Sequence, residues 1–307
     1  MQIIIAAIFP VLALIAMGFY LRARNIIAAE GWQAIDRLIF YVLFPAAMVW
    51  QLAKMDLSGH DVGPMLLAAL SASFVFLLLL LIFRQHVSSD DRAFTAMVQG
   101  ALRFNVFIGL ALGFGFYGAD GMELAALMIA VMTLPNNFIS VFILSRYGDG
   151  QFQNWRSAVV KIIINPNILG CVIGLALYAA GIALPKVLDD SLKLLGQTAL
   201  PMALLSIGAG LRWHVGKNYA GMVALTNVIK LILLPLLVWV FCGWMGVGDL
   251  ESKIAVLYTA LPSATTSYVM SRQMGGHPEL MAGILSSQSL LSMLTIPFVL
   301  YILFHGV

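Results

Sequence analysis

The sequence predicts an all-α integral membrane protein of ten transmembrane helices, arranged as two inverted five-helix repeats. Three observations lead to this fold class: the composition, the spacing of apolar runs and a weak internal repeat. Of the 307 residues, 61% are apolar and only 10% are charged, and the mean hydropathy is +0.96. Soluble domains are about 45–50% apolar and about 25% charged. The composition therefore excludes a soluble enzyme, and it also excludes a disordered protein, which needs low hydrophobicity and high charge.

Apolar runs of about 20 residues, the length that a helix needs to span a bilayer, recur along the chain. Polar clusters such as 85–92 and 148–151 separate them, and such clusters are typical of loops. No linker is long enough to hold a separate soluble domain. The predicted spans are 3–21, 34–53, 63–83, 93–117, 122–145, 158–180, 191–211, 219–242, 253–274 and 279–304.

Basic residues predict the orientation of these helices. Of the 17 Lys and Arg residues, eleven fall with the odd-numbered loops, four with the even-numbered loops and two inside spans. Because positive charge concentrates on the cytoplasmic side, the odd loops are expected to be cytoplasmic and both termini to lie outside. Arg22 and Arg24 follow the first apolar stretch rather than precede it, so we expect a retained helix and not a cleaved signal.

A weak repeat relates the two halves of the chain. An offset of 156 residues aligns six identical pairs, for example Pro45 with Pro201. The halves, 1–150 and 151–307, then hold five helices each. Because five is odd, the second half enters the membrane from the opposite side. Such inverted repeats are typical of secondary transporters, which bind substrate near the midplane where helices are interrupted.

Two basic residues lie deep within predicted spans. Arg103 is about ten residues into the fourth helix, roughly 15 Å deep, and Lys230 lies at similar depth in the eighth. A charge at this depth costs at least ~2.5–3.5 kcal/mol on insertion scales. Neither has an acidic partner in its own span. Either cation could snorkel or bond to helix carbonyls. The alternative is that they bind an anion, and the planar fork of arginine suits a carboxylate.

The fourth and ninth helices are equivalent in the repeat, and both carry residues that favour an interruption. Pro262 removes a backbone donor in the ninth helix, and Gly109 could allow a break in the fourth. If both break, the N-termini of two half-helices would point toward one central point. A proline kink with hydroxyls bonded to their own helix is the alternative. The candidate substrate-binding residues here are Arg103, Asn105, Gly109, Pro262, Ser263, Thr265 and Thr266.

Further intramembrane polar residues extend the candidate site. Besides Lys230 these are Asn136, Asn137, Asn227 and Gln288. Asn227 shares a helix face with Lys230 at i and i+3. Interhelical hydrogen bonding is the alternative role of each amide. The histidines lie in loops or at span ends without metal-ligand spacing, and no catalytic motif is found. We therefore expect no metal, no cofactor and no nucleic-acid partner.

A set of short motifs, taken together in order, resembles one family over essentially the whole chain. They are Asn165-Pro166-Asn167, Ile173-Gly174-Leu175, the run 196–203, Ser206-Ile207-Gly208, Ala260-Leu261-Pro262 and His277-Pro278. In these residues the chain resembles the auxin efflux carrier family, in its bacterial branch of malonate- and malate-type carriers. Asn105 matches the position of the carboxylate-binding asparagine in that family's crossover.

The resemblance implies a fold like that of the bile-acid/sodium symporters. Helices 1, 2, 6 and 7 would form a scaffold, and helices 3–5 and 8–10 a transport core with broken helices 4 and 9. It also implies a homodimer through the scaffold and an elevator-like movement. The chain departs from the plant carriers in having Gly109 rather than a proline in the helix 4 crossover and in its short central loop. The absence of an intramembrane acid in the core disfavours sodium coupling.

These observations predict a secondary active transporter of small organic anions, mono- or dicarboxylates such as malonate or malate, in a bacterial inner membrane. Two alternatives stay open: a carrier of an aromatic monocarboxylate such as auxin, and a channel or transporter-like sensor. A channel would show pore rings or a continuous polar path, whereas this chain has local polar clusters. A membrane enzyme would need a recognisable catalytic arrangement, which the sequence lacks.

Overall fold

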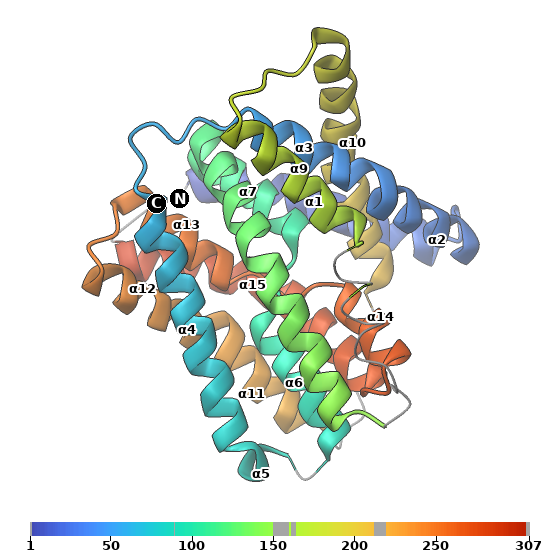
Figure 1. The fold of residues 1–307 in the computed structure, drawn as a ribbon. Helices are drawn as coiled ribbons and strands as arrows, with labels where there is room; N and C mark the ends of the chain where they lie inside the picture. The colour runs from blue at the N-terminus through green and yellow to red at the C-terminus, as the bar shows by residue number, and fades with distance from the viewer. Residues whose placement is uncertain (1, 89, 150–159, 161–163, 212–218, 305–307) are drawn as a thin grey trace. The chain divides into compact units, whose positions relative to one another are not determined.

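In the computed structural model, residues 2–88, 90–149, 160, 164–211 and 219–304 are described, and their regular structure is helical throughout. This confirms the predicted all-helical class. The elements, which can be followed along the colour bar of Figure 1, are α1 (Gln2–Ala23), α2 (Ala29–Leu38), the π-helix η1 (Ile39–Leu43), α3 (Phe44–Ala53), α4 (Val62–Ile82), α5 (Arg84–Val87), α6 (Asp91–Leu102), α7 (Val106–Tyr147), α9 (Pro166–Ala179), α10 (Lys186–Gly210), α11 (Ala220–Val228), the π-helix η3 (Ile229–Leu233), α12 (Leu234–Trp244), α13 (Asp249–Thr259), α14 (Thr266–Gln273) and α15 (Pro278–Phe304).

Several of these helices have the length and apolar character of membrane spans. Among the described residues, six helical stretches are long and apolar enough to cross a bilayer: Ala29–Ala53, Val62–Ile82, Asp91–Tyr147, Lys186–Gly210, Ala220–Trp244 and Pro278–Phe304. Two shorter apolar helices, Ile8–Ala23 and Pro166–Ala179, accompany them. The chain is therefore a multi-pass membrane protein, as its composition predicts.

Helix boundaries differ from the predicted spans where local chemistry intervenes. The second helical stretch begins at Ala29 rather than at residue 34. The described helix of the sixth predicted span begins at Pro166, because Asn165 Oδ1 accepts a 2.9 Å hydrogen bond from Asn167 N and caps it. Most of the predicted start of that span, 158–165, lies outside the described residues.

The predicted interruption of the fourth helix is present. Helix α6 ends at Leu102 and α7 begins at Val106, and the backbone at Arg103 is extended, with ψ of 161°. The expectation that Gly109 allows the break is wrong, because Gly109 lies inside α7, four residues beyond Asn105. A Cβ atom on Gly109 would lie 2.7 Å from Leu261 Cδ1, so its small size serves close packing instead.

The predicted interruption of the ninth helix is also present. Helix α13 ends at Thr259 and α14 begins at Thr266, so residues 260–265 separate them. Pro262 lies in this segment, as expected of a residue whose nitrogen cannot donate a helical hydrogen bond.

Helix α7 consists of two arms that meet at Gly118. Gly118 has φ of 66° and ψ of −145°, a conformation that side chains disfavour. A Cβ atom on Gly113 would lie 2.8 Å from the carbonyl oxygen of Gly121, so the arms pack closely. The arms, 106–117 and 119–147, correspond to the end of the fourth predicted span and to the fifth.

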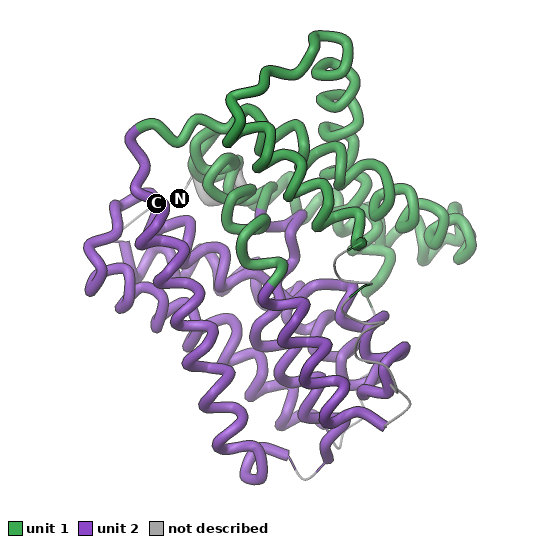
Figure 2. Tube along the Cα trace, in the orientation of Figure 1, with its two compact units in different colours: residues 1–58, 110–134, 160–211 green, residues 59–109, 135–159, 212–307 purple. Residues whose placement is uncertain are grey.

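Figure 2 shows the division of the chain into two compact units. Unit 1 comprises 1–58, 110–134 and 160–211, and unit 2 comprises 59–109, 135–159 and 212–307. In unit 1, α10 packs against α1 and α3, and α3 packs against α9. In unit 2, α12 packs against α4 and α13, and α15 packs against α6, α11 and α14. Both helix breaks belong to unit 2.

Candidate functional site

The two broken helices meet through their non-helical segments in unit 2. The backbone N–H of Asn105 donates a 2.7 Å hydrogen bond to the carbonyl oxygen of Pro262. The hydroxyl of Ser263 donates to the carbonyl oxygen of Gln99 at 3.1 Å. The backbone N–H of Asn105, which lies outside a helix, is thus satisfied by the other broken helix, as a low-dielectric environment requires.

Gln288 of α15 joins the same two segments. Its Nε2 donates to the carbonyl oxygen of Gly100 at 3.0 Å, and its Oε1 accepts from the backbone N–H of Ser263 at 2.8 Å. The side chain is fully buried, with 0% exposure. The side-chain oxygen and nitrogen of Gln288 each form a hydrogen bond with a backbone group. Gln288 therefore holds the two broken helices together, which is the interhelical role named above as the alternative to substrate binding.

Arg103 lies at the break of the fourth helix and reaches the start of α14. Its Nη2 donates to Thr266 Oγ1 at 2.7 Å. Its Nη1 donates to Asn137 Oδ1 at 2.8 Å and to Ser140 Oγ at 3.2 Å, and it lies 3.2 Å from Met270 Sδ. The guanidinium therefore links α7 to α14 on one side of the crossing.

The environment of Arg103 is polar but electrically uncompensated. The residue is only 7% exposed. The contacts given above are with neutral groups, and no carboxylate among the described residues lies within ion-pair distance of it. Its Nε is buried without an acceptor in the described part of the chain. A buried charge without a counter-ion carries a desolvation cost of several kcal/mol, which a bound anion would offset.

Helix N-termini contribute further positive potential beside Arg103. Helix α7 begins directly after Asn105, whose Oδ1 accepts from the N–H groups of Phe107 at 3.1 Å and Ile108 at 3.2 Å. Helix α14 begins at Thr266, and the exposed Thr265 before it makes no side-chain capping bond. Each helix N-terminus carries about half a positive charge. Both helix N-termini thus lie at the breaks, and Arg103 contacts Thr266, the first residue of α14.

The remaining candidates divide into two groups. Asn137 contacts Arg103 directly, and its neighbour Asn136 is buried with an Nδ2 group that has no acceptor among the described residues. Lys230, by contrast, lies in the π-helix η3 and is 1% exposed. Asn227 Nδ2 donates to Ser287 Oγ at 3.0 Å. Neither Lys230 nor Asn227 is among the hydrogen-bond partners of Arg103.

Two contacts of Arg103 were not anticipated from the sequence, Ser140 and Met270. Both stand one helical turn from a predicted site residue, Ser140 after Asn136 and Met270 after Thr266. Residues at i and i+4 share a face, so this spacing was a usable signal. In the described residues, no group of three His, Cys, Asp or Glu side chains is arranged to hold a metal ion.

Comparison of the sequence with known proteins finds similar membrane transporters. The family model described as "Membrane transport protein" matches residues 152–300. An "Uncharacterized transporter" from Methanothermobacter thermautotrophicus is 21% identical over 296 residues, covering 94% of this chain and 95% of that protein.

Two further relatives carry more specific names. A "Putative malonate transporter" from Rhizobium meliloti is 25% identical over 318 residues, covering 97% of this chain and 95% of that protein. "Auxin efflux carrier component 8" from Arabidopsis thaliana is 29% identical over 134 residues, covering 42% of this chain and 35% of that protein. The family and these relatives are transporters and not enzymes. These matches agree with the resemblance read from the sequence motifs: the C-terminal half of the chain matches a family of membrane transport proteins, and its relatives include auxin efflux carriers and a putative malonate transporter.

Proposed function

We propose that this protein is a secondary active transporter of small organic anions, mono- or dicarboxylates such as malonate or malate, which works by elevator-type alternating access. The observation that carries the proposal is the guanidinium of Arg103, which is buried at the crossing of the two helix breaks with no carboxylate partner among the described residues. It lies in unit 2 between the N-termini of α7 and α14.

The donor count of Arg103 suits a single carboxylate. A guanidinium has five N–H donors. Nη1 directs its donors at Asn137 and Ser140, and Nη2 directs one at Thr266. Nη2 has this one acceptor for its two N–H groups, and the buried Nε–H has no acceptor among the described residues. Two N–H groups on a planar fork match the two oxygens of a carboxylate.

In our proposal, the preference for a dicarboxylate over a monocarboxylate depends on a second cation, Lys230. The relative named for malonate, whose alignment covers nearly the whole chain, favours a dicarboxylate substrate. In our proposal Arg103 and Thr266 receive one carboxylate, and Lys230 with Asn227 receives the other. Both cations belong to unit 2, which supports this assignment. Asn105, Asn136, Asn137 and the 262–265 segment complete the proposed substrate site.

The proposed architecture is two inverted repeats of five helices, 1–150 and 151–307. The breaks support it, because they fall in the fourth and ninth predicted spans, which are equivalent in the repeat. The composition of the units supports the scaffold and core assignment in part. Unit 1 contains α1, α3, α9 and α10, and unit 2 contains α4, α6, α12, α13, α14 and α15, whereas α7 is divided, with its 110–134 stretch in unit 1. We propose a homodimer through the scaffold, in a bacterial inner membrane, with both termini outside.

Uptake into proteoliposomes tests the proposed function. Labelled malonate is supplied under an imposed membrane potential, with malate, succinate, pyruvate and indole-3-acetate as competitors. We expect saturable uptake by the wild-type protein and its loss in Arg103→Ala. Arg103→Lys keeps the positive charge but loses the planar guanidinium that can bind both carboxylate oxygens, so it should lose most of the uptake. Arg272→Ala is the matched control, because Arg272 is an exposed arginine on α14.

The competitors separate the alternatives. Inhibition by indole-3-acetate alone would replace the dicarboxylate with an aromatic monocarboxylate. Wild-type uptake by Arg103→Ala would remove Arg103 from the site and contradict the proposal. Currents at channel rates without saturation would contradict a carrier mechanism.

A further inference from the structure

An apolar groove lies between α4 and α7 in unit 2. Leu77 and Leu81 of α4 line one side, and Phe138, Ile139 and the run 141–143 of α7 line the other. The groove has a volume of about 290 Å³, and every residue that lines it is apolar. It does not include the Arg103 site, whose contacts are described above. A groove of this kind offers contact to a hydrocarbon chain but no hydrogen-bond partner to a polar ligand.

Two arginines stand beyond one end of this groove. Arg84 begins α5, two residues after the end of α4, and Arg146 follows Phe142 by four residues, about one turn along α7. The guanidinium carbon of Arg84 lies 4.4 Å from the ring centroid of Tyr147, and that of Arg146 lies 5.2 Å from the same centroid. Both guanidinium groups therefore contact one aromatic ring at the ends of the groove-forming helices.

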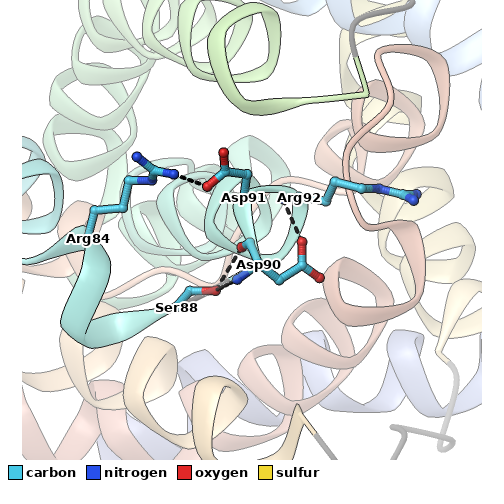
Figure 3. A network of polar contacts seen from close by, with 5 residues as sticks. All are labelled: Arg84, Ser88, Asp90, Asp91 and Arg92. Carbon is cyan, nitrogen blue, oxygen red and sulfur yellow. Dashed lines mark hydrogen bonds and ion pairs between the residues drawn. The ribbon is translucent and has the colours of Figure 1, made fainter.

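These two arginines keep donors that the protein does not use. Arg84 pairs with Asp91, as Figure 3 shows, but its buried Nε has no acceptor among the described residues. Arg146 is exposed, and none of the described carboxylates lies within ion-pair distance of it.

The neighbouring Arg92 is different from these two arginines. Its Nη1 lies 3.2 Å from Asp149 Oδ2, and its Nε and Nη2 donate to the carbonyl oxygen of Gly276. Arg92 is therefore occupied, and the cationic end of the groove consists of Arg84 and Arg146.

We propose that an anionic phospholipid binds here, with one acyl chain in the α4–α7 groove and its phosphate between Arg84 and Arg146. In the orientation predicted from the loop charges, this end of the groove lies on the cytoplasmic side. The cytoplasmic leaflet is the anionic one, and each arginine near its surface favours anionic lipid. A continuous apolar and cationic surface fits an amphiphile, whereas a free phosphate would use only the arginines. The proposal is independent of the transported substrate.

Native mass spectrometry of the full-length purified protein tests whether the lipid headgroup binds to the two arginines. The probes are phosphatidylglycerol and phosphatidylcholine with identical acyl chains. We expect preferential retention of phosphatidylglycerol by the wild-type protein. Arg146→Gln should weaken it about fivefold, which corresponds to about 1 kcal/mol for one arginine near an anionic surface. Arg24→Gln is the matched control, because Arg24 also stacks on a tyrosine, 5.6 Å from the Tyr20 ring centroid, but lies in unit 1.

A second variant tests the acyl-chain half. Ile139→Trp fills the groove and leaves both arginines in place, so it should weaken phosphatidylglycerol binding without changing the charge. Soluble glycerol phosphate should not displace the lipid. Equal retention of the two lipids, or unchanged binding in both Arg146→Gln and Ile139→Trp, would overturn the proposal. Displacement by glycerol phosphate would overturn it too, by showing a phosphate site without a lipid. Arg84→Gln should weaken phosphatidylglycerol binding as well, and if that variant fails to fold, Arg146→Gln decides whether the headgroup binds here.

Discussion

Asn105 and Pro262 are joined by a 2.7 Å hydrogen bond from the backbone N–H of the first to the carbonyl oxygen of the second. The two residues are 157 positions apart in the chain, and each lies in a non-helical segment between helices. Unsatisfied backbone groups cost several kcal/mol in a hydrocarbon environment. The two breaks are therefore tolerated because a backbone group of one forms a hydrogen bond with a backbone group of the other. At the same place, Arg103 contacts Thr266.

Removal of the Asn105 side chain should weaken the start of α7. Its Oδ1 accepts from Phe107 N and Ile108 N, and loss of such a cap costs about 1 kcal/mol. We expect Asn105→Ala to unfold at lower temperature than the wild type in detergent, and Asn105→Ser to recover most of the loss. Equal stability of the Ala and Ser variants would show that capping is not the role of this side chain.

Gln288 is expected to be the most sensitive amide of the crossing. Gln288→Leu keeps the volume but leaves the buried N–H of Ser263 and the carbonyl of Gly100 without partners. Each orphaned group costs about 1–3 kcal/mol. Thermal unfolding should show a large loss of stability compared with Gln273→Leu, which changes an exposed glutamine of α14. A loss no greater than that of Gln273→Leu would contradict this role.

Helices α1 and α10 of unit 1 approach so closely that they require glycine. A Cβ atom on Gly208 would collide with the carbonyl oxygen of Ile15, and one on Gly18 would collide with that of Leu205. Overpacking costs about 1–3 kcal/mol even where side chains can move, and backbone moves less readily. We expect Gly208→Ala to reduce the yield of folded protein measured by size-exclusion chromatography. Gly210→Ala, where nothing lies within 4 Å, is the control on the same helix and should behave as wild type.

Lys230 tests the two-cation form of the proposed site. Lys230→Met keeps a similar volume and removes the charge, and replacing a buried ion in this way is often neutral for stability. We expect malonate uptake to fall at least tenfold, while uptake of a monocarboxylate such as pyruvate is unchanged, because Arg103 serves the remaining carboxylate. Unchanged malonate uptake in a folded Lys230→Met variant would remove Lys230 from the site.

The polar residues and the proline at the two breaks could be recognised from the sequence because they do not fit the apolar helices around them. Arg103 interrupts an apolar run, and Pro262 cannot continue a helix. Their burial and the break in each helix agree with that reading. The position of the fourth-helix break was misjudged at Gly109. Glycine permits an unusual backbone but does not demand one, and at this position it serves the contact with Leu261 instead.

By itself, the sequence determined that the chain is a helical multi-pass membrane protein, which segments are apolar and which polar residues lie deep within them. These properties depend on composition and on periodicity along one chain. Only the tertiary structure decided the partners of Arg103 and the use of both ends of Gln288. Those contacts join residues between 25 and 188 positions apart. Side-chain hydrogen bonds depend on distances of about 3 Å between helices, which spacing along one helix does not specify.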